Sequence, residues 1–177
     1  MQMIVEIAER QEQLALNRRR WRDLMSDTAL AELPFRIETN AHGQIIMNPP
    51  PSGVNSYRQS QILLTLRDLI GGQPLAECPL STLDGVKAVD VGWYSDQRFE
   101  LVRHQELFEI APEICIDVLS PGNTATEITH KKKLYFDSGA SEVWLCLLTG
   151  AMEFYLDSRP EVSQRESRLC PEFPSSF

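Results

Sequence analysis

The stretch EICIDVLSPGNTATE, residues 113–127, decides the class of the fold. Residues 113–119 are nearly all apolar apart from Asp117, which is typical of a central strand covered on both faces. The letters SPGN then break the strand. The TATE that follows, residues 124–127, has the spacing of a capping box that opens a helix. A buried strand that leads directly into a helix indicates an α/β arrangement.

Outward from this stretch the chain alternates short strands with helices. The patterns predict helices over residues 1–31, 55–70 and 124–138, and strands over 35–38, 44–47, 75–80, 85–94, 113–119, 143–148 and 151–156. The sequence therefore predicts an α/β domain with one central mixed sheet flanked by helices, preceded by an N-terminal helix and a β-hairpin. We expect this single domain over residues 1–157 and a polar, loosely held C-terminal tail over residues 158–177.

Composition narrows the possible functions. The 17 Lys and Arg against 25 Asp and Glu give a net charge of −8, which argues against a broad basic surface for nucleic acid. Contact with nucleic acid would have to be local, or an acidic site would recruit a divalent cation. No membrane span or secretory signal is visible, and the four cysteines are scattered, so we expect a cytoplasmic protein without a zinc cluster.

Four charged residues interrupt or flank these apolar patterns. Asp90 and Asp117 each lie within an apolar strand, where an unpaired carboxylate is costly to desolvate. Lys131 falls at the centre of the apolar face of its predicted helix. Glu38, in the first hairpin, is the weakest of the four because it alternates with Arg36 as an exposed strand residue would.

Each of these residues also has an ordinary structural interpretation. A buried aspartate can be satisfied by backbone N–H groups, and an aspartate at a strand end is often a turn former. A lysine can extend past apolar neighbours to reach water. Lys132 and Lys133 fall outside the apolar face and are predicted to be surface lysines.

Taken together, two aspartates, an inward lysine and a glutamate match one chemistry well. Carboxylate oxygens bind Mg²⁺, which polarises a phosphodiester and lowers the pKa of a bound water, and a lysine orients that water and offsets negative charge. The chain has no phosphate-binding GxxxxGK[ST], no GxGxxG, no GxSxG and no HExxH.

The segments FRIETNAHGQIIMNPPP, STLDGVKAVDVGWYS, APEICIDVLSPGNT and KKKLYFDSGASEVWLC, in this order, resemble the Uma-type putative restriction endonuclease domain family of the PD-(D/E)XK nuclease group. The resemblance covers residues 15–157. It implies a restriction-endonuclease-like fold, Mg²⁺ or Mn²⁺ as cofactor, and phosphodiester hydrolysis in nucleic acid, with DNA as the expected partner. By position it implies that Asp90 and Asp117 are metal ligands and catalytic residues. It further implies that Lys131 is a catalytic lysine displaced onto the helix, and that Glu38, the acidic residue of the hairpin, is also a catalytic residue.

Three interpretations stay open at this point. The first is a metal-dependent endonuclease, which needs Asp90, Asp117 and Lys131 around one cavity. The second is a catalytically inactive nucleic-acid-binding or regulatory module of the same fold. The third is a structural domain, in which Asp117 and Lys131 form a closed ion pair without a cavity. For an endonuclease that cuts both strands we expect a homodimer.

Overall fold

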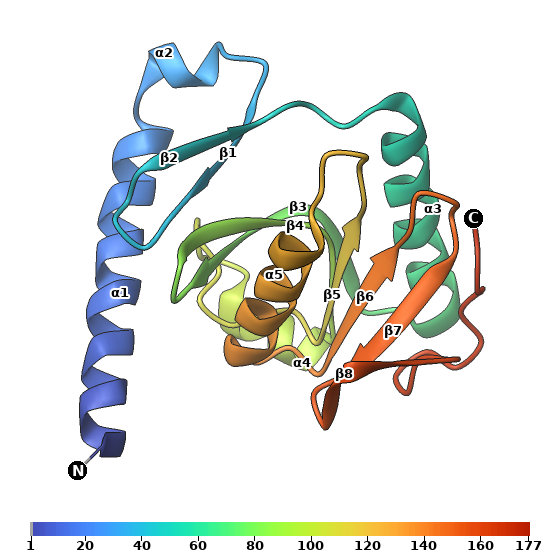
Figure 1. The fold of residues 1–177 in the computed structure, drawn as a ribbon. Helices are drawn as coiled ribbons and strands as arrows, with labels where there is room; N and C mark the ends of the chain where they lie inside the picture. Colours follow the sequence, from blue (N-terminus) through green and yellow to red (C-terminus); the bar gives the residue numbers. More distant parts are fainter. Residues whose placement is uncertain (1) are drawn as a thin grey trace.

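The computed structural model describes the backbone of residues 2–177 and the side chains of residues 9–177. Met1, which the predicted N-terminal helix includes, lies outside the described residues. The helices are α1 (Gln2–Met25), α2 (Thr28–Ala31), α3 (Gly53–Ile70), α4 (Asp96–Val102) and α5 (Ala125–Asp137) (Figure 1). The strands are β1 (Arg36–Thr39), β2 (Ile45–Asn48), β3 (Gln73–Thr82), β4 (Gly85–Tyr94), β5 (Ile114–Val118), β6 (Glu142–Cys146), β7 (Met152–Leu156) and β8 (Arg159–Gln164).

Six strands form the central sheet in the order β3-β4-β5-β6-β7-β8, and β1 pairs with β2 in a separate hairpin. The pair β5–β6 is parallel, and every other pair is antiparallel. A parallel pair needs a long crossover, which α5 supplies between β5 and β6. The predicted α/β domain with a central mixed sheet, flanking helices, an N-terminal helix and a hairpin is therefore confirmed.

The two faces of the sheet are covered by different helices. Ile62 and Leu66 of α3 pack with Trp144 in one core cluster, whereas Tyr135 of α5 packs with Cys115 in another. In Figure 1, α5 crosses in front of the sheet. The predicted capping box starts α5, because the Thr124 side chain and the side chain three residues later cap each other's backbone N–H groups.

The β1–β2 hairpin lies against the first half of β4, which β5 does not reach. The backbone N–H of Val86 donates to Thr39 Oγ1 at 2.9 Å, and that of Ala88 donates to Glu38 Oε1 at 3.0 Å. Side chains of the hairpin thus satisfy backbone donors that a neighbouring strand would otherwise take. Gly85 permits this approach, since a Cβ there would meet the carbonyl oxygen of Thr39.

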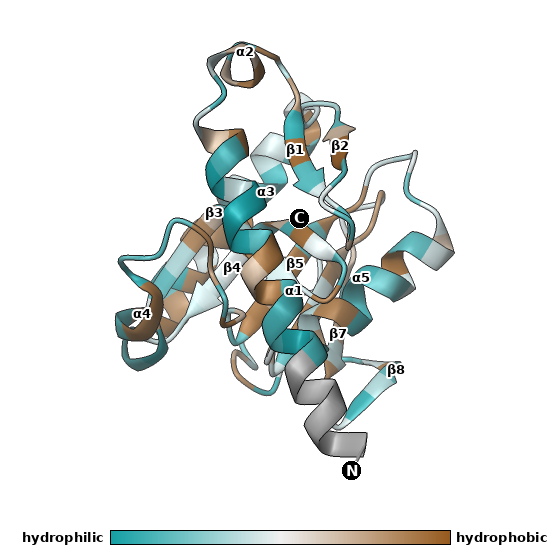
Figure 2. Ribbon diagram, turned by 90° about the vertical axis from the view of Figure 1, so that its left-hand side faces the viewer, coloured by the Kyte–Doolittle hydropathy of each residue, from teal (hydrophilic) through white to brown (hydrophobic). Residues whose placement is uncertain are grey.

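The structure differs from the expected tail after residue 157. Residues 159–164 form β8 on β7, and Cys170 and Phe173 are buried in the core that contains Trp144. The residues of β8 are mostly polar because β8 is the edge strand of the sheet, and Figure 2 shows most of this strand in the hydrophilic colour. The short helix α4 is a second element that the sequence patterns did not predict.

A buried carboxylate fastens the C-terminal segment to the sheet. Glu142 on β6 is fully buried and accepts hydrogen bonds from Trp144 Nε1 at 2.7 Å, Ser167 Oγ at 2.8 Å and the Leu169 backbone N–H at 2.8 Å. These bonds explain how a polar segment is held without a long apolar run. No helix within the described part of the chain is long and apolar enough to span a membrane.

Glu142→Ala is expected to lower the free energy of unfolding by about 3 kcal/mol, because it leaves these buried donors without an acceptor. Urea denaturation followed by tryptophan fluorescence measures the change. The matched control is Glu161→Ala on the exposed face of β8, which should change stability by less than about 0.5 kcal/mol. Equal stability of the two variants would contradict the assigned role of Glu142.

Candidate functional site

The four residues singled out from the sequence meet at one place, from four different elements. Asp90 on β4, Asp117 on β5 and Lys131 on α5 line a cavity of about 280 Å³. Glu38 on β1 joins them, because the Lys131 ammonium donates to Glu38 Oε1 at 2.9 Å. The structure brings all four together; that they perform catalysis stays a prediction.

Asp90 and Asp117 lie just beyond the last residue pair of the ladder between β4 and β5. Val91 pairs with Ile116, so the two aspartates are the next residues along each strand. Asp90 is only 5% exposed, and its Oδ2 accepts from the Val118 backbone N–H at 2.7 Å. Its Oδ1 is ion-paired with the guanidinium of Arg36, which also lines the cavity.

Asp117, unlike Asp90, has a neutral hydroxyl and not a cation as its direct side-chain partner. It is 9% exposed, and the hydroxyl of Tyr135 lies 3.1 Å from each of its oxygens. Burial raises the pKa of Asp117 to about 7; the Lys131 ammonium opposes this rise, while the charges of Asp90 and Glu38 add to it. A cation placed in the cavity would favour the ionised form of Asp117.

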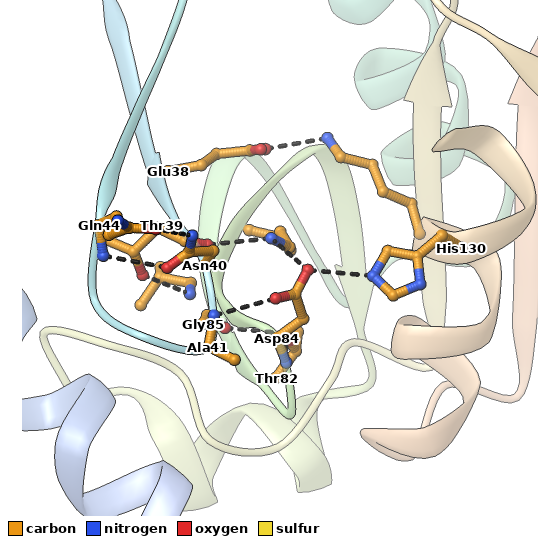
Figure 3. A network of polar contacts seen from close by, with 12 residues as sticks. Glu38, Thr39, Asn40, Ala41, Gln44, Thr82, Asp84, Gly85 and His130 are labelled. Atoms are coloured by element: carbon orange, nitrogen blue, oxygen red, sulfur yellow. Dashed lines mark hydrogen bonds and ion pairs between the residues drawn. The ribbon is translucent and has the colours of Figure 1, made fainter. Parts of the chain in front are cut away.

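Lys131 lies between Glu38 and Asp117. Burial by itself disfavours its charged form, but attraction to Asp117 and Glu38 outweighs burial and leaves the pKa of Lys131 raised. The reciprocal effect lowers the pKa of Glu38, since Lys131 overcomes the cost of burying that carboxylate. Both groups are therefore charged at neutral pH. Figure 3 shows the Glu38 side chain extending from the hairpin toward α5.

A second set of polar contacts holds the elements that carry Glu38 and Lys131. Asp84, in the turn between β3 and β4, accepts from the Ala41 backbone N–H at 2.9 Å, and its other oxygen lies 3.0 Å from His130 Nε2 on α5 (Figure 3). Lys87 pairs with Asp84 at 3.2 Å and donates to the Thr39 carbonyl at 2.9 Å. The hairpin, the turn and the helix are thereby connected around the cavity.

The prediction that Lys132 is a surface lysine is wrong. Lys132 is 9% exposed, its ammonium lies 3.5 Å from the centre of the Tyr155 ring, and it donates to the Pro160 carbonyl at 3.1 Å. The cause is the β7–β8 hairpin, which covers this side of α5 and which the sequence patterns did not include. Lys133 is exposed, as predicted, and pairs with Asp137 one turn away.

Three residues of the site were not identified from the sequence: Arg36, Tyr135 and Asn55. Arg36 lies two residues before Glu38 and therefore on the same side of β1, and Tyr135 lies one turn after Lys131 on α5. These spacings in the sequence therefore indicate that Arg36 lies beside Glu38 and that Tyr135 lies beside Lys131. Asn55 on α3 donates to Ser120 Oγ at 2.8 Å at the edge of the cavity, a contact between distant segments that no local pattern indicates.

The observed geometry does not match the structural-domain interpretation. That interpretation requires a closed ion pair of Asp117 with Lys131 and no cavity, whereas Lys131 donates to Glu38 and a cavity opens beside Asp117. The cavity is lined by the carboxylates of Asp90 and Asp117 together with the cationic side chains of Arg36 and Lys131.

The donor set fits a divalent metal ion. Within residues 9–177 no group of three or more His, Cys, Asp or Glu side chains is placed so that it could hold a metal ion. Mg²⁺ does not need such a group, because it usually keeps several waters and binds one or two carboxylates. Asp90 and Asp117 supply two carboxylates on one cavity whose volume admits water.

Comparison with known proteins identifies a family and solved structures of similar fold. A family model described as Uma2, putative restriction endonuclease, matches residues 27–173. The crystal structure of a putative nuclease belonging to DUF820 from Anabaena variabilis superposes with a TM-score of 0.62 at 20% identity, covering 82% of this chain and 91% of that one. At this identity the likeness shows a shared fold. No curated protein matches the sequence.

The raised pKa of Asp117 predicts a pH dependence of stability in the metal-free protein. Between about pH 4 and 7 the folded protein holds a proton that the unfolded chain has lost, so the free energy of unfolding falls as the pH rises. Asp117→Asn removes this pH dependence. The free energy of unfolding of the variant, relative to that of wild type, should therefore rise by about 2 kcal/mol between pH 5 and pH 8. Urea unfolding in EDTA measures the difference.

The control for this experiment is Asp68→Asn, at an exposed position of α3. Its stability relative to wild type should not change over the same interval. If Asp117→Asn behaves as the control does, Asp117 does not carry the raised pKa.

Proposed function

The chain belongs to the Uma2 family of putative restriction endonucleases, and from this membership we propose that it hydrolyses phosphodiester bonds of DNA with the help of Mg²⁺ or Mn²⁺. The observation that carries the proposal is that Asp90, Asp117 and Lys131, from three different elements, line one cavity. The family match and the shared fold together identify a protein of a nuclease family with the fold of a putative nuclease.

Asp90 and Asp117 are the residues that would hold the cation. When bound, a divalent metal supplies Lewis-acid polarisation of the phosphodiester and a water of lowered pKa. The two carboxylates are fixed for this purpose by different means, one by the Val118 backbone N–H and one by the Tyr135 hydroxyl. Fixed ligands reduce the reorganisation that binding would otherwise require.

Lys131 and Glu38 act on the substrate side of the site. The Lys131 ammonium orients the attacking water and offsets the negative charge that grows on the phosphate oxygens during attack. Glu38 holds Lys131 in place through the 2.9 Å hydrogen bond and keeps its ammonium charged. Glu38 is thus a positioning residue.

The net charge of −8 is compatible with this proposal if contact with DNA is confined to the cavity and its rim. Arg36 and Lys131 are the cationic residues that line the cavity. Few phosphate contacts imply weak binding with a shallow salt dependence, because few counterions are released.

Cleavage of supercoiled plasmid in the presence of Mg²⁺ or Mn²⁺ tests the proposal. Lys131→Ala should lower the cleavage rate by about 10²-fold or more, the scale of losing one electrostatic contact to the transition state. Asp90→Ala should abolish cleavage. Lys133→Ala is the matched control, since Lys133 lies on the same helix but is exposed to solvent, and it should cleave like wild type.

Equal rates for Lys131→Ala and Lys133→Ala would contradict the role of Lys131. Wild-type protein that retards DNA in a gel but never cleaves it with either metal would instead identify the inactive nucleic-acid-binding module. Thermal unfolding of each variant separates loss of chemistry from loss of fold.

We further propose a homodimer, as an enzyme that cuts both strands of a duplex would use two copies of the site. Val54, Tyr57 and Leu64 lie along one side of α3 and are each more than half exposed, an arrangement that supports burial against a second copy. We also propose a cytoplasmic location. The four cysteines are free thiols, which supports a reducing compartment. Light scattering across a wide concentration range should give twice the chain mass; a constant monomer mass would contradict the dimer.

A further inference from the structure

We propose that Arg36 competes with the divalent metal for Asp90 and moves to Glu77 when the metal binds. The inference rests on the proposed function, since it concerns the metal site of that function. It assigns to Arg36 the control of metal affinity, a role separate from those of the carboxylates and Lys131.

The contacts of Asp90 place Arg36 where a metal would compete with it. One Asp90 oxygen accepts from the Val118 backbone N–H, and the other is ion-paired with Arg36 Nη1. The oxygen that is free of backbone contacts is therefore held by the guanidinium. Arg36 also lines the cavity beside Asp117. A divalent cation that binds Asp90 from this cavity needs the lone pairs that Arg36 uses.

Glu77 on β3 offers Arg36 a second carboxylate. Both Glu77 oxygens lie 3.3 Å from Arg36 Nη1, the same nitrogen that pairs with Asp90. The Glu77 side chain is 40% exposed, whereas that of Asp90 is 7% exposed. A guanidinium that leaves Asp90 can thus form a two-nitrogen pair with Glu77, the preferred geometry for arginine and a carboxylate, without losing a counter-charge.

Two independent features indicate that Arg36 and Glu77 form a movable pair. Arg36 Nε is buried and has no hydrogen-bond partner, the one such side-chain nitrogen or oxygen among the described residues. A pair with Glu77 through Nε and Nη would satisfy it. Glu77 itself has a φ of 53°, alone among the described residues other than glycine in having a positive φ. Such backbone strain concentrates at functional sites.

Binding of Mn²⁺ to the full chain, measured from the electron paramagnetic resonance signal of free Mn²⁺, tests the competition without reference to activity. Arg36→Gln should bind Mn²⁺ about tenfold more tightly than wild type, because the competitor is gone. Arg36→Lys keeps the charge but not the two-nitrogen geometry and should bind with intermediate affinity. Glu77→Gln removes the alternative anchor, strengthens the hold of Arg36 on Asp90 and should weaken binding several-fold.

The double variant Arg36→Gln/Glu77→Gln separates competition from plain electrostatics. If Glu77 acts through Arg36, Glu77→Gln has almost no effect once Arg36 is gone; if both act only as distant charges, their effects add. Arg20→Gln is the matched control, since Arg20 donates to the Gly43 carbonyl of the same hairpin but lies outside the residues that line the cavity. It should bind Mn²⁺ like wild type.

The outcomes distinguish this inference from the proposed function. If Arg36→Gln binds Mn²⁺ with the same affinity as wild type, and Asp90→Asn abolishes Mn²⁺ binding in both backgrounds, the role of Arg36 is overturned and the metal site is retained. Equal gains for Arg36→Gln and Arg20→Gln, or additive effects in the double variant, would also overturn it. Absence of Mn²⁺ binding in every variant would remove the metal site of the proposed function and this inference with it. Thermal unfolding in EDTA confirms that each variant is folded.

Discussion

Burial of three carboxylates in one small volume is the constraint around which this structure is organised. Glu38, Asp90 and Asp117 are all less than one-tenth exposed, and a buried charge is costly unless it is paired and hydrogen-bonded. Each carboxylate is compensated by a group from an element other than its own: Glu38 by a lysine of α5, Asp90 by an arginine of β1, and Asp117 by a tyrosine hydroxyl of α5. Removing any one of these elements would leave a charge without a partner.

The same constraint explains the position of the N-terminal hairpin. The first half of β4 has backbone donors that β5 does not reach, and the hairpin satisfies them with the side chains of Thr39 and Glu38 rather than with a strand ladder. A side chain can accept a backbone N–H and also contact a second group, as Glu38 does with Lys131. The hairpin therefore serves both as a structural partner of β4 and as a wall of the site.

The fold compensates two of these carboxylates only in part. Asp117 has a hydroxyl as its direct partner, and burial keeps its pKa near 7, so its charge is only partly supported. Asp90 is compensated by an arginine whose Nε is itself unsatisfied. Perturbed groups gathered on one cavity are typical of functional sites, where ligands replace partners that the fold supplies imperfectly.

The sequence by itself determined the class of the fold, the family resemblance and the positions of Asp90, Asp117 and Lys131, because charged residues interrupt regular apolar periods that are readable locally. Only the tertiary structure decided which groups meet them. Arg36 and Asp90 are 54 residues apart, and Lys131 and Glu38 are 93 apart, so no local period relates them. The burial of Lys132 escapes the local pattern for the same reason, since its partner Pro160 lies 28 residues further along the chain. Periodicity shows which side chains face inward, whereas the partner of an inward charge depends on how distant segments pack.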